Sequence, residues 1–235
     1  HWLARCASES KLMNQWPICV IPNPIDTDRW HPVCPKFAKA KLGLPESQTV
    51  IAFGGFGCMT DPNKGFDLLL SAINRMARLA KRPLLVVFAE KQTDQVPKFD
   101  CPVYYLGTIE DDTKLQLLYS AADVLAVPSR QDAFNQIAAE AQSCGTPVVA
   151  FNNTGPADIV EHGTTGYLAK AFDTDDFAKG LHWLLDMLEP QRAKHRHQAR
   201  TRAISLFSYS IIASRYLDLY MRVREQSRHQ TKSSF

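Results

Sequence analysis

Two carboxylates, Asp132 and Glu140, stand eight residues apart in the stretch PSRQDAFNQIAAEAQSCGTPVV, residues 128–149. Apolar runs typical of strands flank this stretch, so we expect the first acid on a loop and the second on the helix that follows it. Eight helical residues rise about 12 Å, which is too far for both acids to act on one bond. The pair is better placed to hold the two ends of an elongated ligand. The backbone N–H groups of residues 133–136, at the start of the helix, would then face negative charge on that ligand.

Each acid also has a plainer explanation when it is taken alone. Asp132 has the residue type and the position of a helix N-cap, and Glu140 fits a solvated helix face. Both explanations stay open here, although the flanking sequences make the pair a stronger signal than either acid by itself.

A second candidate for binding negative charge is Lys64, in the segment FGGFGCMTDPNKGFDLLLSA, residues 53–72. Gly54 and Gly55 allow the backbone to approach a ligand closely, and Lys64 at the start of the next helix supplies a positive charge suited to a phosphate. The segment matches neither the G-x-G-x-x-G pattern nor the G-K-[ST] end of a phosphate-binding loop. The alternative is an ordinary solvated lysine in the first turn of a helix.

The elements that must position these residues alternate between short apolar runs and stretches of helical periodicity. We expect strands at 49–54, 83–89, 103–106, 123–127, 147–151 and 166–168. We expect helices at 64–80, 112–121, 134–144, 155–161 and 175–188. Such alternation predicts an α/β fold, with a Rossmann-like parallel sheet, helices on both faces, and ligands bound at the carboxyl ends of the strands.

The two ends of the chain lie outside this alternation. The first residues predict a helix, a short strand and a proline-rich turn at 22–24. Because His1 falls inside that helix, we expect the chain to begin in the middle of a longer protein. Two further helices are expected at 189–207 and 209–223, followed by a disordered polar tail at 226–235.

Composition excludes several classes of protein. The 235 residues are 45% hydrophobic and 22% charged, which suits a well-packed globular unit, and a net charge of +3 is too small to indicate nucleic-acid binding. The six cysteines lie far apart and form no C-x-x-C pair, so we expect neither a zinc site nor a disulfide framework, and a cytoplasmic location is the simpler expectation. No apolar run approaches the length of about 20 residues that a membrane span needs.

Other charged patterns fit structural explanations better than chemical ones. The D-x-D patterns at 26–28 and 173–175 lie in a turn and at a helix start, which favours capping over metal binding. Asp111 and Asp112 are explained by the preference for acids in a first helical turn. A basic run predicts a solvated helix face, with contact to anionic lipid as the alternative. It comprises Arg192, Lys194, Arg196, Arg200 and Arg202.

The acid pair and its surroundings resemble the acid-x7-acid signature of retaining glycosyltransferases of family four, which have the GT-B fold of two Rossmann-like domains. In that family the first acid and the N–H groups after it hold the donor sugar, and the second acid binds the ribose hydroxyls of the nucleotide. The resemblance implies ribose contacts for Glu140. Asp132 stands where the family usually has the longer Glu. The implied sugar-binding residues are Asp132, Ala133, Phe134, Asn135 and Gln136.

The resemblance extends to the glycine-rich segment. In the family, an Arg after a glycine and the Lys of a K-G pair neutralise the departing diphosphate. Lys64 and Gly65 match the K-G pair, but Gly55 occupies the place of the Arg. Lys64 is therefore expected to carry the diphosphate charge alone or with a basic group from elsewhere. The segment after the third strand lies against the nucleobase in the family, which implies base contacts for Gly107 and Ile109.

The resemblance also implies that this chain is the C-terminal, donor-binding half of such an enzyme. Residues 1–25 would be the end of the acceptor domain and the interdomain linker, and residues 26–207 the nucleotide-sugar-binding domain. Residues 208–235 would be a helix that crosses back to the absent N-terminal domain, followed by a tail. An ordinary amphipathic helix packed on the same domain is the alternative.

The implied function is that of a nucleotide-sugar-dependent retaining glycosyltransferase in polysaccharide biosynthesis. It would transfer a hexose to a glycan or lipid-linked acceptor, with Lys64 and Asp132 as catalytic residues and with neither a metal nor another cofactor. Acceptor contacts would belong to the absent N-terminal domain, so this chain alone is expected to be inactive. Peripheral contact with the inner face of a membrane stays open. The alternatives are a non-catalytic nucleotide-sugar-binding module and a GT-B-fold epimerase or phosphorylase.

Overall fold

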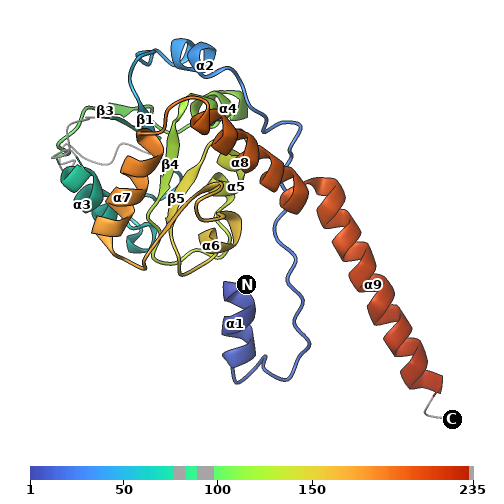
Figure 1. The fold of residues 1–235 in the computed structure, drawn as a ribbon. Helices are drawn as coiled ribbons and strands as arrows, with labels where there is room; N and C mark the ends of the chain where they lie inside the picture. Colours follow the sequence, from blue (N-terminus) through green and yellow to red (C-terminus); the bar gives the residue numbers. More distant parts are fainter. Residues whose placement is uncertain (77–82, 89–97, 233–235) are drawn as a thin grey trace.

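The computed structural model describes residues 1–76, 83–88 and 98–232 and has a six-stranded parallel sheet at its centre (Figure 1). The strands are β1 (Val50–Gly54), β2 (Leu84–Phe88), β3 (Val103–Tyr105), β4 (Val124–Val127), β5 (Val148–Phe151) and β6 (Gly166–Ala169). They lie in the order β3-β2-β1-β4-β5-β6, so the strand order reverses between β1 and β4. This arrangement confirms the expected α/β fold with a Rossmann-like parallel sheet.

Helices cover both faces of the sheet because its inner strands are apolar on both sides. On β1, Val50 and Ala52 pack into one core cluster, and the alternate residues Ile51 and Phe53 pack into the other. The first cluster lies under α2 (Pro35–Lys41), α4 (Asp112–Ala121), α5 (Gln136–Ser143), α6 (Pro156–Ile159) and α8 (Gln191–Phe207). The second lies under α3 (Phe66–Met76) and α7 (Thr174–Leu185).

The expected positions of the helices and strands in this body are confirmed to within a few residues. The helix expected at 134–144 begins at Gln136, because Asn135 has a left-handed φ of 77° and its side chain accepts a hydrogen bond from the Ala138 N–H. The helix expected at 155–161 ends at Ile159. The helix expected at 64–80 begins at Phe66, and residues 77–80, like residue 89 of the second expected strand, lie outside the described residues. Helix α2, which opens with Pro35, was not expected.

Two expectations for the ends of the chain are wrong. Residues 17–24, all of which the structure describes, form no strand, and prolines at positions 17, 22 and 24 explain why, since proline has no N–H to donate to a sheet. Residues 226–232 are not a disordered tail but continue α9 (Tyr209–Lys232). No glycine or proline interrupts that helix.

The basic run on α8 is not the solvated face that the sequence predicts. Four of its arginines donate hydrogen bonds to backbone carbonyls at or just beyond the C-terminal ends of other helices. These carbonyls have no intrahelical hydrogen-bond donor and lie at the negative end of the helix dipole. A guanidinium supplies both the missing donors and a positive charge. The pairs are Arg192 with Leu185 and Met187 after α7, Arg196 with Ser120 and Ala122 after α4, Arg200 with Ser143 of α5, and Arg202 with Ile159 of α6.

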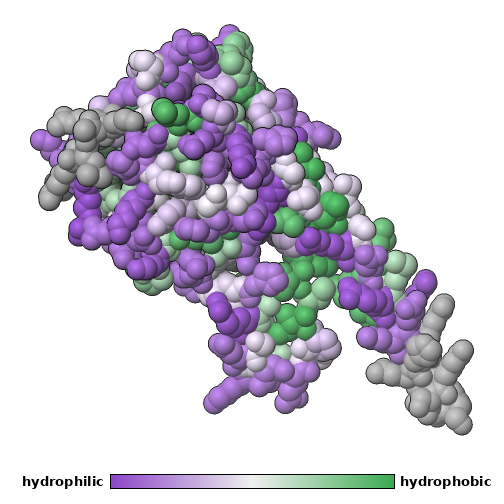
Figure 2. Space-filling view, viewed as in Figure 1, coloured by the Kyte–Doolittle hydropathy of each residue, from purple (hydrophilic) through white to green (hydrophobic). Residues whose placement is uncertain are grey.

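Helices α1 (Trp2–Glu9) and α9 lie outside the body formed by the sheet and its helices (Figure 1). The Ile25 N–H donates to the Phe207 carbonyl at 2.7 Å, so the segment that leads from α1 and the start of α9 leave the body side by side. Both extensions expose apolar side chains, among them Leu12, Trp16, Leu217 and Tyr220. Figure 2 shows apolar surface gathered along them. Within the described residues, no helix is long and apolar enough to span a membrane.

Candidate functional site

A cavity of about 700 Å³ opens at the carboxyl ends of β1 and β4. Its walls come from the glycine-rich turn after β1, the loop after β4 and the first turn of α5. The strand order reverses here, so the loops from β1 and β4 diverge to opposite faces of the sheet and leave a crevice between them. Eight of the predicted site residues line it. They are Gly54, Gly55, Lys64, Asp132, Ala133, Phe134, Asn135 and Gln136.

The glycine-rich turn depends on the absence of side chains at two positions. A Cβ on Gly54 would lie 2.2 Å from the Phe88 carbonyl oxygen, and Gly55 has a φ of 112°, which other residues rarely adopt. The chain then forms a single 3-10 turn at Pro62–Lys64, capped by Asp61, whose side chain accepts from the Asn63 N–H at 2.8 Å. This turn places Lys64 on the cavity wall.

Lys64 and Asp132 meet in this cavity. Lys64 Nζ lies 2.9 Å from Asp132 Oδ2, and the Asp132 side chain is only 13% exposed. The same carboxylate accepts hydrogen bonds from Asn135 Nδ2 at 3.0 Å and from the Phe134 N–H at 3.3 Å. Asp132 is therefore not the N-cap of α5, a role that Asn135 takes, and the capping explanation of this acid is wrong.

The start of α5 supplies N–H groups to the same cavity. Gln136 and Ile137 line it from the first helical turn, where backbone N–H groups have no intrahelical acceptors and the helix dipole is positive. Gly155, which comes after β5, contacts the loop between β4 and α5 and holds it in place. Its N–H donates to the Asp132 carbonyl at 2.8 Å, and a Cβ on it would lie 2.4 Å from the Ala133 carbonyl oxygen. Together with Lys64, these groups can bind an anion beside the Asp132 carboxylate.

Glu140 lies one turn into α5 and is buried, with only 8% of its surface exposed. The Tyr119 hydroxyl donates to Glu140 Oε2 at 3.0 Å. Burial raises the pKa of Glu140 to about 7, although hydrogen bonds from Tyr119 and Gln136 act in the opposite direction. The explanation of Glu140 as part of a solvated face is therefore wrong.

Three predicted site residues do not line the cavity: Gly107, Ile109 and Glu140. Gly107 and Ile109 lie on the loop between β3 and α4, and Ile109 packs against the core cluster to which Tyr119 belongs. The structure thus brings together the residues predicted to hold the sugar and the diphosphate. The residues predicted to hold the ribose and the base lie outside the lining of that cavity.

Within the described part of the chain, no second Lys or Arg lines this cavity to share the role expected of Lys64. Arg130, on the loop after β4, forms a bidentate pair with Asp67 at 2.7 and 2.6 Å and donates to the Pro62 carbonyl at 2.9 Å. This pairing raises the pKa of Arg130 and lowers that of Asp67. Among the described residues that line the cavity, Lys64 is the only Lys or Arg.

Sequence reasoning missed two residues that shape this site, Tyr119 and Gly155. Tyr119 reads as an ordinary apolar position of a helix, and nothing in its sequence context reveals its partner 21 residues away. Gly155 had a weak signal, since a Gly-Pro pair marks a turn or a helix start but does not reveal the close backbone contact.

The acids that we assigned to capping do cap turns and helices. Asp173 accepts from the N–H groups of Asp175 and Asp176, and Asp111 accepts from that of Thr113. Asp26 accepts from the Arg29 N–H at 3.0 Å. No group of three or more His, Cys, Asp or Glu side chains is arranged to hold a metal ion within the part of the chain that the structure describes.

Comparison with known proteins places these features in a family. A family model described as glycosyl transferases group 1 matches residues 48–187, which contain all six strands. D-inositol 3-phosphate glycosyltransferase 2 of Catenulispora acidiphila is 32% identical over 219 residues, which is 87% of this chain and 50% of that protein. The chain spans about half the length of the curated relatives that it matches.

Solved structures show the same fold. Sucrose-phosphate synthase from Thermosynechococcus elongatus matches 94% of this chain and 56% of its own, with a TM-score of 0.75 and 26% identity. HepE of Anabaena, solved in complex with UDP-glucose, matches 87% of this chain and 57% of its own (TM-score 0.69, 20% identity). The C-terminal domain of LpcC, a glycosyl transferase group 1 family protein from Francisella tularensis, matches 79% of this chain and 99% of its own (TM-score 0.65, 17% identity).

Proposed function

Because this chain belongs to the glycosyl transferases group 1 family, we propose that it is the donor-binding half of a retaining glycosyltransferase that uses a nucleotide sugar. The cavity between β1 and β4 would hold the diphosphate and the sugar of that donor. The observation that carries the proposal is the meeting of Lys64, Asp132 and the start of α5 around one cavity. A cation, a carboxylate and free N–H groups are the partners that a sugar diphosphate requires.

Each group has a separate task in this proposal. Lys64 and the N–H groups at the start of α5 stabilise the negative charge that develops on the diphosphate as the bond to the sugar breaks. Asp132 accepts hydrogen bonds from sugar hydroxyls and orients the ring. A hexose would be transferred to a glycan or lipid-linked acceptor, in a reaction that belongs to polysaccharide biosynthesis.

The nucleoside would extend from the cavity toward Glu140. In this arrangement the Glu140 carboxyl group, held in place by Tyr119, binds the ribose hydroxyls. Gly107 and Ile109 contact the base. Support for the class of donor comes from HepE, which has the same fold and was solved with UDP-glucose.

The acceptor-binding half would dock on the two apolar extensions. We assign residues 1–25 to the end of that half and the linker, 26–207 to the donor-binding domain, and 208–235 to the crossing helix and tail. The side-by-side exit at Ile25 and Ser208 supports this division, as do the exposed side chains of Leu217 and Tyr220. The relatives are about twice as long as this chain, which leaves a domain of similar size to cover these surfaces.

A binding measurement tests the proposal. We expect UDP-, GDP- or ADP-sugars to bind the chain, and Lys64→Ala to weaken a nucleoside diphosphate about 10- to 100-fold while sparing the free nucleoside, since a hydrogen bond to a charged group is worth about 1.5–3 kcal/mol. The matched control is Lys36→Ala, which removes a lysine of α2 that is paired with Glu46. Equal losses for both ligands would exclude Lys64 from the diphosphate site, and failure of every nucleotide sugar to bind would refute the donor-binding role.

A second candidate is a nucleotide-sugar-binding module without catalytic activity. It is favoured by Gly55 at the place of the family's Arg and by the three donors that already engage the Asp132 carboxylate. Product analysis distinguishes the two candidates. We expect no sugar transfer by this chain alone, and transfer once an N-terminal half is supplied. A binding module predicts no product in either case. Turnover by the chain alone would contradict the assignment of the acceptor site to a separate N-terminal half.

A further inference from the structure

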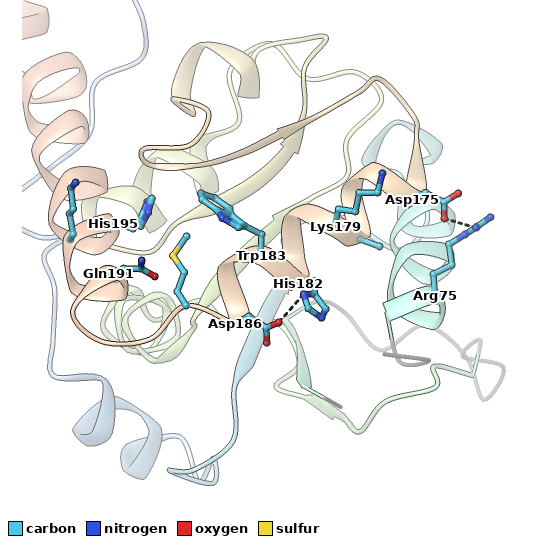
Figure 3. A pocket seen from close by; sticks show the side chains of 11 residues that line it. Arg75, Asp175, Lys179, His182, Trp183, Asp186, Gln191 and His195 are labelled. Carbon is cyan, nitrogen blue, oxygen red and sulfur yellow. Dashed lines mark hydrogen bonds and ion pairs between the residues drawn. The ribbon is translucent and has the colours of Figure 1, made fainter. Parts of the chain in front are cut away.

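A second hollow, of about 1050 Å³, lies along the outer face of α7 and shares no lining residue with the cavity between β1 and β4 (Figure 3). The side chains of α7 that line it repeat at helical spacing along one face, from Asp175 to Trp183, and Asp186 and Met187 line it just after the helix. Arg75 of α3 borders it at one end and the first turns of α8 at the other. Nothing in the proposed donor chemistry uses these residues.

An aromatic platform forms the middle of this hollow. Trp183 is 37% exposed, and its ring makes an edge contact with His195 at 5.3 Å and a tilted contact with Tyr167 at 6.0 Å. His195 is itself fixed, because its Nδ1 lies 2.6 Å from the Thr164 carbonyl oxygen and donates to it. Figure 3 shows Trp183 and His195 reaching toward each other from α7 and α8. A Trp held in this way offers a rigid apolar surface at little entropic cost, which suits packing against the C–H face of a sugar ring.

Two lysines add positive charge on either side of this platform. Lys179 lies one turn before Trp183 on α7, and Lys194 lies on α8 next to His195. Neither forms an ion pair with any side chain that the structure describes. Arg75 and His182, in contrast, are paired with Asp175 at 2.5 Å and Asp186 at 2.9 Å. The hollow is therefore positive around an aromatic ring, with paired carboxylates and Gln191 available to hydrogen-bond hydroxyl groups.

We propose that this hollow binds an acidic glycan, with one sugar ring stacked on Trp183 and its anionic group held by Lys179 and Lys194. The site does not depend on the nucleotide-sugar site. A planar anionic membrane fits less well, because Trp183 lies in a hollow flanked by Asp175 and Asp186. A nucleic acid needs a longer track of cations than two lysines provide. On a glycosyltransferase, such a site would hold a charged acceptor or product chain away from the reacting atoms.

Calorimetric titration of the 235-residue chain with tetragalacturonate and a heparin tetrasaccharide tests this site, with maltotetraose as the neutral control. We expect at least one acidic tetrasaccharide to bind, more weakly as salt is raised, and maltotetraose to bind at least about tenfold more weakly. Trp183→Ala should weaken the acidic ligand by about tenfold or more, and Trp183→Phe by less, since a smaller ring remains. The Lys179→Gln/Lys194→Gln pair should weaken it and remove the salt dependence.

Two controls separate this site from general effects. Trp16→Ala removes a tryptophan that is 70% exposed elsewhere and should change nothing. Lys64→Ala should leave glycan binding intact even where it abolishes diphosphate binding, so this site and the donor site can fail independently. The proposal is overturned if neither acidic tetrasaccharide binds, if Trp183→Ala leaves the affinity unchanged, or if maltotetraose binds equally well. Tighter binding of a single-stranded oligonucleotide or of anionic vesicles through the same three residues would also overturn it.

Discussion

At the scale of single residues, the Lys64–Asp132 ion pair would couple the diphosphate and the sugar of a nucleotide sugar in the proposed site. The Asp132 carboxylate already has three donors, two of them on Oδ2, so departure of Lys64 frees an acceptor site on Oδ2 for a sugar hydroxyl. A diphosphate competes with Asp132 for Lys64, because phosphate oxygens also accept hydrogen bonds from an ammonium group. Binding of the diphosphate would thus release the carboxylate to the sugar.

The first prediction concerns Asp132→Asn. The ionic partner of Lys64 is lost, so the sugar-free nucleoside diphosphate should bind at least as tightly as before, while the intact nucleotide sugar binds more weakly. Asp132→Glu, which reaches further by one methylene, should preserve or improve affinity for the nucleotide sugar. Because Asn135 caps α5, the melting temperature should change little, as is usual for a partly exposed ion pair worth about 0–1 kcal/mol. An unchanged nucleotide-sugar affinity in Asp132→Asn would remove this residue from the sugar site.

The second prediction concerns the buried carboxyl of Glu140, whose pKa is raised by burial to about 7. An unfolded chain would release that proton near the ordinary value of 4.5, so the folded state binds more protons between pH 4.5 and 7. The contribution of Glu140 to the free energy of unfolding should fall as the pH rises through this window. Glu140→Gln should remove this fall and raise the free energy of unfolding at pH 8 by up to about 3 kcal/mol, at about 1.4 kcal/mol per pKa unit.

Urea denaturation at several pH values measures this effect, and nucleotide binding provides the second reading. Glu140→Gln keeps an oxygen to accept from the Tyr119 hydroxyl, so packing is preserved. If Glu140 binds ribose as a carboxylate, nucleoside affinity should rise through pH 7 in the original chain and lose this dependence in the variant. A pH profile of stability identical in both proteins would show that folding does not raise the pKa of Glu140.

At the scale of elements, α8 holds the C-terminal ends of four helices together. Three of its arginines, Arg192, Arg196 and Arg200, follow one another at intervals of four residues and so lie on one helical face. That face packs on the domain through Ala199, Ala203 and Phe207, which are buried. The arginines of the run donate hydrogen bonds to backbone carbonyls, and Lys194 is its exposed member.

The third prediction tests this role with Arg196→Met. The variant keeps the apolar stem but removes the donor to the Ser120 and Ala122 carbonyls, so we expect a loss of about 1–3 kcal/mol in the free energy of unfolding. Lys194→Met, on the exposed side of the same helix, is the matched control and should stay within about 0.5 kcal/mol of the original chain. Similar losses in both variants would mean that the hydrogen bonds of Arg196 add nothing to stability.

At the scale of the whole molecule, the body formed by the sheet and its helices differs from the two extensions in how its apolar side chains are covered. The sheet has helices on both faces, but α1, the segment after it and α9 expose large apolar side chains. Exposed apolar surface of this extent marks an interface in most soluble proteins. It is consistent with the proposed contact with an N-terminal half.

The fourth prediction is that the chain by itself associates through α9. Substitution of Leu217 and Tyr220, which are 61% and 64% exposed, by glutamine should reduce self-association while nucleotide-sugar affinity is unchanged. Leu188→Gln, at a leucine of the body that is 74% exposed, is the control and should not reduce it. Sedimentation velocity measures the oligomeric state. Association that persists in the double variant would place the self-contact elsewhere.

The sequence by itself determined the features that depend on neighbours along the chain. Apolar runs alternating with helical periodicity predicted the parallel sheet, and the strand positions differ from the observed ones by one or two residues at most. Capping acids such as Asp173 were predicted because their partners lie two or three residues away. Lys64 was singled out by the glycine-rich turn before it and Asp132 by its spacing from Glu140, and both segments resemble one family; the two residues line the same cavity.

Only the tertiary structure decided which side chains meet across long stretches of chain. The ion pair of Asp132 with Lys64 joins residues 68 positions apart, and the hydrogen bond from Arg200 to the Trp30 carbonyl joins residues 170 apart. The burial of Glu140 against Tyr119 likewise depends on how α4 packs beside α5. The local sequence pattern cannot predict these contacts. A helical face with polar residues can be buried when carbonyl and hydroxyl groups from distant parts of the chain form hydrogen bonds with its side chains.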